Sequence, residues 1–194
     1  MTEKASLRKK LKAARASIPE EAKHSYDDLI FQNVVKTDAY KNCRELLIYV
    51  SGGIEVGTHD IIRQAFLDGK LVLVPRCVSG TNIMEFFRIC SFDDLEIGAY
   101  GILEPKQHCS EQTEFNDAIC IVPALAFEKN GYRIGFGKGY YDRFLKGFSG
   151  PKLGICYEKF VIDDVYMEPH DIPVDLIVTE KRTLIIDKDE RNDN

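Results

Sequence analysis

Residues 46–74, LLIYVSGGIEVGTHDIIRQAFLDGKLVLV, contain the strand, helix and strand that determine the fold. Leu46–Val50 and Leu71–Val74 are short continuous apolar runs, typical of strands that are covered on both faces. Between them, Thr58 can cap a helix with one apolar face, and Gly69 ends it. Such a βαβ unit implies two parallel strands joined by a right-handed crossover. The loop after the first strand therefore lies at the carboxyl edge of the sheet, where α/β sheets bind ligands.

The rest of the chain repeats this pattern of helices and buried strands. The first sixteen residues and Ala22–Val34 have apolar side chains at helical spacing, and residues 17–20, SIPE, predict a capping box before the second helix, which should end near Thr37. Further strands are expected at Met84–Ile89, Ala118–Val122, Leu153–Cys156, Leu176–Thr179 and Thr183–Ile186, and a helix at Tyr140–Lys146. We predict an α/β fold, a single-domain three-layer αβα sandwich with a mostly parallel central sheet, over residues 1–186, followed by a polar tail at 187–194.

Composition excludes several classes of protein. The 194 residues carry a net charge of −5, which argues against a nucleic-acid-binding protein. The chain lacks an apolar run of the roughly 18 residues that a membrane helix needs, and its amino end lacks an apolar signal core. Six cysteines without a CxxC pair are expected to be reduced core thiols rather than disulfides or zinc ligands. We therefore expect a monomer that works in the cytoplasm and binds neither membrane nor nucleic acid.

The stretch Val122–Leu145, VPALAFEKNGYRIGFGKGYYDRFL, holds the strongest chemical signal. Its glycines Gly135, Gly137 and Gly139 occupy every second position, which lets the backbone curl tightly and approach a ligand closely. Backbone amides at the start of the helix that follows would attract phosphate oxygens.

Charged residues around these glycines favour phosphate and metal binding over a simple turn. Arg133, Lys138 and Asp142 supply two cations and one carboxylate. The stretch is not a P-loop, because Tyr132 stands where that pattern needs its first glycine and Tyr140 where it needs Ser or Thr. It also departs from the dinucleotide pattern GxGxxG, since the glycines fall as GxGxG.

At two further places, the residues alone allow two interpretations each. Lys4 and Arg8 are four apart on the basic first helix and share one face, which suits either a solvated charged surface or an anion site. Glu55 follows the first strand of the βαβ unit, where a glutamate is either solvated or part of a ligand site. The four histidines match no triad or metal spacing, so we assign them no role.

The block GYRIGFGKGYYDRFL resembles the signature of the 5-formyltetrahydrofolate cyclo-ligase family, also called 5,10-methenyltetrahydrofolate synthetases. The resemblance extends over most of the chain in the same order. It includes the basic first helix with Lys4 and Arg8, the IEVGT loop, the KLVLVPR strand, GILEP at Gly101–Pro105, and VPALAF before the glycines.

The resemblance implies an ATP-dependent ligase of folate and one-carbon metabolism. Its reaction converts 5-formyltetrahydrofolate and ATP into 5,10-methenyltetrahydrofolate, ADP and phosphate, with Mg²⁺ as cofactor and ATP as co-substrate. The implied route phosphorylates the formyl oxygen, after which the folate N10 attacks that carbon and phosphate leaves. Such phosphoryl transfer depends on positioning and on charge neutralisation.

The resemblance also implies roles for individual residues. The ATP-binding set is Lys4, Arg8, Arg133, Gly135, Gly137, Lys138, Gly139 and Tyr141, of which Lys138 and Arg133 are expected to be catalytic. The folate-binding set is Glu55, Phe136 and Tyr140. Asp142 and Asp171 would bind Mg²⁺, with Asp175 as the rival of Asp171.

Two alternatives and one departure from the family pattern accompany this interpretation. The same scaffold would serve a non-catalytic folate- or nucleotide-binding regulatory protein, and the phosphate site would also suit a small-molecule kinase. Gly57 stands where the family often has a larger, commonly acidic residue, which predicts a looser loop around Glu55 and weaker folate binding.

Overall fold

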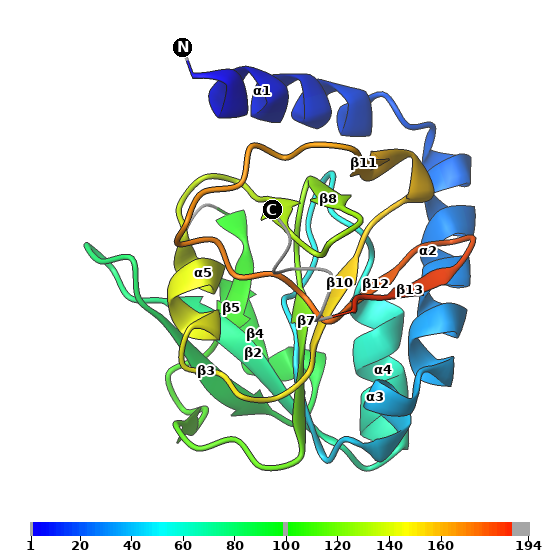
Figure 1. The fold of residues 1–194 in the computed structure, drawn as a ribbon. Helices are drawn as coiled ribbons and strands as arrows, with labels where there is room; N and C mark the ends of the chain where they lie inside the picture. Colours follow the sequence, from blue (N-terminus) through cyan, green and yellow to red (C-terminus); the bar gives the residue numbers. More distant parts are fainter. Residues whose placement is uncertain (1, 99–100, 188–194) are drawn as a thin grey trace.

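The computed structural model describes residues 2–98 and 101–187, and within them the chain forms an eight-stranded sheet (Figure 1). The order of its strands is β13-β12-β10-β7-β1-β2-β3-β6. Their bounds are β1 (Glu45–Leu47), β2 (Leu71–Cys77), β3 (Met84–Ile89), β6 (Glu111–Gln112), β7 (Ala118–Val122), β10 (Lys152–Ile155), β12 (Leu176–Val178) and β13 (Thr183–Ile185). The helices are α1 (Glu3–Ala16), α2 (Glu20–Lys36), α3 (Asp38–Asn42), α4 (His59–Leu67) and α5 (Tyr140–Leu145).

The predicted βαβ unit is present, and the mostly parallel sheet is confirmed. β1 pairs in parallel with both β2 and β7, and β10 pairs in parallel with β7 and β12. The edges are antiparallel, because β3 returns directly from β2 and β13 returns from β12 through short connections. The hairpin expected near the carboxyl end is this β12–β13 pair.

Alternate side chains of the strands build two separate cores, one on each face of the sheet. Leu46 and Ile48 face the core under α2 and α4, whereas Leu47 faces the core beside α5. Figure 1 shows α2, α3 and α4 on one side of the sheet and α5 on the other. The layers are unequal, and the thinner one consists of α5 with a cluster of aromatic rings that includes Phe144 and Phe148.

Local signals were less reliable than the strand pattern. The predicted capping box at residues 17–20 is wrong, because Pro19 occupies the N-cap position of α2 and the Ser17 hydroxyl donates to the carbonyl of Ala14. Thr58 stands at the N-cap of α4 as expected, but its hydroxyl donates to the carbonyl of Tyr49, two residues after the end of β1. The short helix α3 was not predicted.

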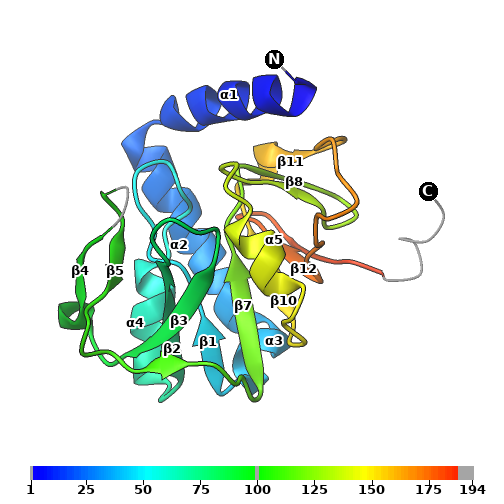
Figure 2. The same cartoon turned by 90° about the vertical axis from the view of Figure 1, so that its left-hand side faces the viewer.

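The first helix lies outside the two helical layers. In Figures 1 and 2, α1 crosses the top of the molecule, above the loops at the carboxyl ends of the parallel strands. Beneath it is a small sheet in the order β11-β8-β9, formed by Val161–Ile162, Ala126–Glu128 and Arg133–Ile134. A third sheet pairs β4 (Leu95–Ile97) with β5 (Leu103–Pro105).

Three further predictions concern the carboxyl-terminal tail, the cysteines and membrane-spanning helices. Beyond Asp187, the predicted tail at 187–194 lies outside the described residues. All six cysteines are described, and each is a free thiol. Among the described helices, none has the length and apolar character needed to cross a membrane.

Candidate active site

Basic side chains of α1 attach this helix to the loops at the carboxyl edge. Their positions, 4, 8, 12 and 15, follow helical spacing and therefore share one face. Arg8 Nε donates to the carbonyl oxygen of Gly135 over 2.9 Å, and Lys12 Nζ lies 5.3 Å from the ring centroid of Phe136. The first helix is thus docked on the glycine loop, and the fully solvated charged face is excluded.

Lys4 joins the same helix to the loop that precedes β12. Its Nζ lies 2.7 Å from Asp171 Oδ2 and 2.8 Å from Glu168 Oε2. Burial alone would lower the pKa of Lys4, but its hydrogen bonds to these two carboxylates outweigh that effect and raise it. The ammonium group therefore stays charged at this edge of the site.

The glycine loop, residues 135–139, passes directly below Arg8. Gly137 has a φ of +101°, and a Cβ there would lie 3.2 Å from Arg8 Cζ. Gly139 has a φ of +68° and forms the N-cap of α5. Both positions need glycine for their backbone conformation, and Gly137 also needs it for the close approach of α1. Phe136 and Lys138, which alternate with the glycines of this loop, are exposed.

Arg133 is buried beneath this loop rather than displayed on it. Only 5% of the residue is exposed, its Nη2 lies 2.6 Å from Asp142 Oδ1, and its Nη1 donates to the carbonyl of Ile172 over 2.7 Å. Asp142 Oδ1 also accepts from the amide of Ile172 over 3.4 Å. The Arg133–Asp142 pair thereby ties α5 to the loop that carries Asp171.

The loop that carries Glu55 lies at the same edge, after β1. Glu55 Oε2 accepts a hydrogen bond from the amide of Gly52 over 3.0 Å. Burial raises the pKa of this carboxyl group. The looser loop predicted from Gly57 is wrong, because the amide of Gly57 donates to Asp27 Oδ1 over 3.0 Å. Asp27, from α2, occupies the space that a larger residue at position 57 would need.

The two tyrosines at the start of α5 point in different directions. Tyr140 Oη donates to the carbonyl of Thr81, at the tip of the β2–β3 hairpin, over 3.3 Å. The Tyr141 hydroxyl is buried, and burial raises its pKa well above the usual range. Among the described residues, the Tyr141 hydroxyl and Arg15 Nη2 are the buried side-chain atoms that lack a hydrogen-bond partner.

Two groups of described residues bring together at least three side chains of the kinds that bind metal. One is Glu168, His170 and Asp171, within the site. The other is Asp94, His108 and Cys109, at the β4–β5 end of the molecule, where His108 Nε2 pairs with Asp94 over 3.1 Å. Of the predicted Mg²⁺ ligands, Asp142 and Asp171 both offer the hard carboxylate oxygens that Mg²⁺ prefers. Asp171 pairs with the Lys4 ammonium, and Asp142 pairs with the Arg133 guanidinium. The donor chemistry of these two residues therefore suits the ion.

Sequence reasoning missed several residues of this region. Arg15, Lys12 and Glu168 all contact the predicted site, but none of them belongs to the glycine stretch or to another recognised motif. The available signal was the continuation of the Lys4 and Arg8 face to position 15.

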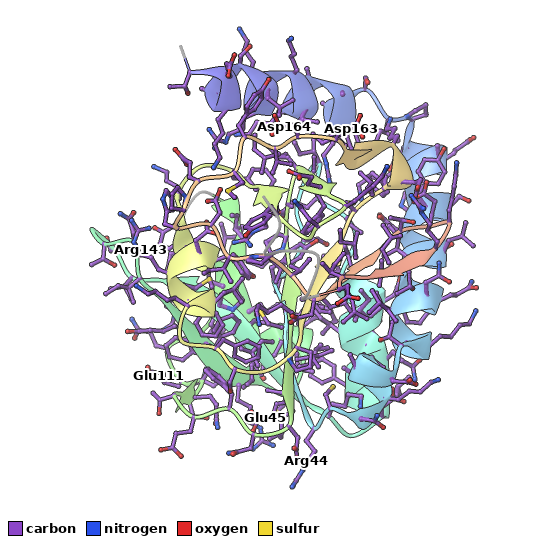
Figure 3. The ribbon with its side chains drawn as sticks, in the orientation of Figure 1. Arg44, Glu45, Glu111, Arg143, Asp163 and Asp164 are labelled. Carbon is purple, nitrogen blue, oxygen red and sulfur yellow. The ribbon has the colours of Figure 1, made fainter. Side chains whose placement is uncertain are left out.

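A large cavity lies at the opposite edge of the sheet. It has a volume of about 1020 Å³ and is lined by residues that precede the parallel strands, including Asp117, Gly150 and Asp175. Figure 3 shows Arg44 and Glu45 at this end of the molecule, whereas Asp163 and Asp164 lie below α1 at the other. Apart from Asp175, none of the predicted site residues lines this cavity. Asp175, the predicted rival of Asp171, belongs to this distant edge and accepts from the amide of Lys152 over 2.9 Å.

Comparison with known proteins identifies consistent relatives. A model of the 5-formyltetrahydrofolate cyclo-ligase family matches residues 1–180. The chain is 31% identical to the 5-formyltetrahydrofolate cyclo-ligase of Mycoplasma genitalium, covering 92% of this chain and 98% of the relative. It is 28% identical to a probable 5-formyltetrahydrofolate cyclo-ligase of Caenorhabditis elegans, covering 95% of this chain and 96% of the relative.

Solved structures give the same result. The NMR structure of 5,10-methenyltetrahydrofolate synthetase from Aquifex aeolicus superposes with a TM-score of 0.82 at 31% identity, covering 95% of this chain and 93% of the other. A synthetase from Mycoplasma pneumoniae superposes with a TM-score of 0.74 at 24% identity, covering 92% of this chain and 99% of the other, and supports the fold alone.

Proposed function

The chain belongs to the 5-formyltetrahydrofolate cyclo-ligase family of enzymes, and from that premise we propose that it cyclises 5-formyltetrahydrofolate to 5,10-methenyltetrahydrofolate with ATP. The observation that carries the proposal is the meeting of three segments at the carboxyl edge. Arg8 on α1 contacts the glycine loop, and Lys4 contacts Asp171 near the other end of the chain. The Glu55 loop lies at the same edge.

The proposed reaction has two steps. The formyl oxygen attacks the γ-phosphorus of ATP, so that ADP leaves and the formyl group becomes an iminium phosphate. The folate N10 then forms a bond to the formyl carbon, and inorganic phosphate departs with the former formyl oxygen. The proton of N10 is released to solvent. Each step moves negative charge onto phosphate oxygens, so cations at fixed positions lower the barrier.

In this proposal the glycine loop and α1 hold the triphosphate between them. Gly135, Gly137 and Gly139 allow the backbone to approach the phosphates, and the exposed side chain of Lys138 can reach the transferring group. Lys4 and Arg8 bind phosphate from above. The contacts of Arg133 support a positioning role through Asp142, in addition to the catalytic role first predicted from the resemblance.

Asp142 and Asp171 are the residues that we propose to hold Mg²⁺, which when bound would neutralise phosphate charge. The side chain of Asp142 is 22% exposed, so solvent reaches part of it. The ammonium of Lys4 already pairs with Asp171, so phosphate and cation binding at this point involve a rearrangement of the same ion pairs.

We propose that Glu55 binds the pterin ring. A carboxylate accepts paired hydrogen bonds from amino and ring N–H groups, and only one Glu55 oxygen is engaged by the Gly52 amide. Phe136 and Tyr140 border the site and would contact the aromatic parts of the folate.

The test is turnover of 5-formyltetrahydrofolate with Mg-ATP, followed by the near-ultraviolet absorbance of the methenyl product. Replacement of Lys138 by Ala should reduce kcat/KM about 100-fold or more, as expected for loss of a charged contact to the transition state. Folate binding without product formation by the folded wild-type protein would instead favour the non-catalytic binding protein. Wild-type turnover by Lys138→Ala would remove the role of that lysine.

We also propose that the enzyme acts as a monomer in the cytoplasm. The six free thiols suit a reducing compartment. Light scattering of the purified protein, with the mass of one 22.1 kDa chain expected, tests the first point.

A further inference from the structure

Arg15, in the last turn of α1, is a buried cation that joins three parts of the site. Only 3% of the residue is exposed. Its Nε donates to the carbonyl of Leu125, on the segment that leads to the glycine loop, over 3.0 Å. Its Nη1 donates to the carbonyl of Ile54, next to Glu55, over 3.3 Å.

The groups around this guanidinium only partly offset the free-energy cost of removing its charge from water. Its Cζ lies 5.4 Å from the ring centroid of Tyr157 and 4.9 Å from that of Phe160, so aromatic faces cover it. Within the described part of the chain, Arg15 Nη2 is buried without a hydrogen-bond partner. Burial lowers the pKa of Arg15. A charged group in such a place costs stability.

Arg15 interacts electrostatically with the carboxyl group of Glu55. Burial raises the pKa of Glu55, and the Gly52 amide and the positive charge of Arg15 oppose that rise. Lys23, from α2, acts in the same direction. Tyr49, after β1, and Tyr141, on α5, also interact with the Glu55 charge, and both hydroxyls remain neutral because burial raises their pKa values.

Hydrogen bonds fix the Glu55 loop on either side of the carboxylate. Arg15 holds the carbonyl of Ile54, the Tyr49 hydroxyl donates to the carbonyl of Val56 over 3.1 Å, and Asp27 holds the amide of Gly57. Of these three hydrogen bonds, the one made by Arg15 comes from α1. It therefore connects the loop proposed to bind folate with the helix proposed to bind ATP.

We propose that Arg15 is a positioning residue that supplies the counter-charge of Glu55 and orients its loop, so that the carboxylate is ready to accept the N–H groups of the pterin. Arg15 acts on substrate through Glu55. The inference rests on the proposed function, because it assigns a recognition role within the same site.

The experiment compares Arg15→Gln and Arg15→Lys with the wild type. Gln removes the positive charge, whereas Lys keeps the charge but lacks the planar set of N–H donors of the guanidinium. Arg15→Gln should raise the KM for 5-formyltetrahydrofolate at least 10-fold at neutral pH, with a smaller change in the KM for ATP. The rise of folate KM toward acid should begin at a higher pH in Arg15→Gln, and Arg15→Lys should restore the wild-type pH profile. Identical pH profiles for all three proteins would overturn the proposal.

A double-mutant cycle with Glu55→Gln separates positioning from a general structural effect. If Arg15 acts through Glu55, adding Arg15→Gln to Glu55→Gln should change the folate KM less than 2-fold further. An equal 10-fold effect in both backgrounds would contradict the inference. Arg63→Gln, at an exposed arginine paired with Asp60, is the control and should match the wild type.

Two measurements keep the outcomes distinct. Thermal unfolding shows which variants are folded. If Arg15→Gln does not fold, Arg15→Lys provides the test. Absence of turnover in the wild type refutes the proposed function. Normal wild-type turnover together with unchanged folate KM in the Arg15 variants refutes only the inference about Arg15.

Discussion

Replacement of Arg133 by Met tests whether this arginine organises the site from within the protein. The side chains of Arg133 and Asp142 are 4% and 22% exposed, and their nearest charged atoms lie 2.6 Å apart. Removing one partner of a buried ion pair costs about 3–5 kcal/mol, because the other charge is left without compensation. Water can reach part of Asp142, so we expect a loss near the lower end, about 3 kcal/mol.

Urea unfolding followed by far-ultraviolet circular dichroism measures this loss, since the chain has no tryptophan. For a chain of this length the loss corresponds to a decrease in Tm of about 6–12 °C. Arg63→Met removes an exposed arginine whose side chain is 59% accessible, and this control should change the free energy of unfolding by less than about 0.5 kcal/mol. A loss below about 1 kcal/mol for Arg133→Met would refute the reasoning and favour direct ATP binding.

Three further predictions concern other parts of the site. The pKa of Glu55 is raised in the folded protein, chiefly by burial, so its ionised form disfavours folding at neutral pH. Glu55→Gln should therefore stabilise the protein by about 1–2 kcal/mol at pH 7 while weakening folate binding. Urea titrations should show this gain shrinking as the pH falls through the raised pKa of Glu55, and no gain below 4.5, the ordinary pKa of a glutamate. Gly137→Ala should cost about 1–3 kcal/mol because its φ is positive, whereas Gly135→Ala, whose Cβ would meet no described atom within 4 Å, should leave stability unchanged in the same assay. Lys4→Met should raise the KM for ATP about 10-fold, and equal KM values would remove Lys4 from the ATP site.

The resemblance carried by the RIGFGKGYYD block predicted the family, and the family match confirms it. It also predicted which residues would gather at the carboxyl edge. The structure brings together Lys4, Arg8, the glycine loop and Asp171, with Glu55 on a neighbouring loop. Their ligands remain predictions until binding is measured.

Other features depended on contacts that no spacing reveals. Thr58 carries an ordinary capping side chain, yet its hydroxyl donates to the carbonyl of Tyr49, because the segment after β1 lies within reach. Gly57 suggested a loose loop, but Asp27 from a distant helix holds its amide. Arg133 looked like a ligand of phosphate, and its contacts with Asp142 and Ile172 emerged only from the packing of α5.

The sequence by itself determined the sheet and its layers, because buried parallel strands require continuous apolar runs and leave that pattern in a single segment. It also determined the chemistry available to the glycine loop, since residue types and close spacing are local properties. The tertiary structure alone decided which charges meet, namely Lys4 with Asp171 across 167 positions and Arg15 with the Glu55 loop. The partners of a charged side chain depend on the path of the whole chain, and therefore on long-range packing rather than on neighbouring residues.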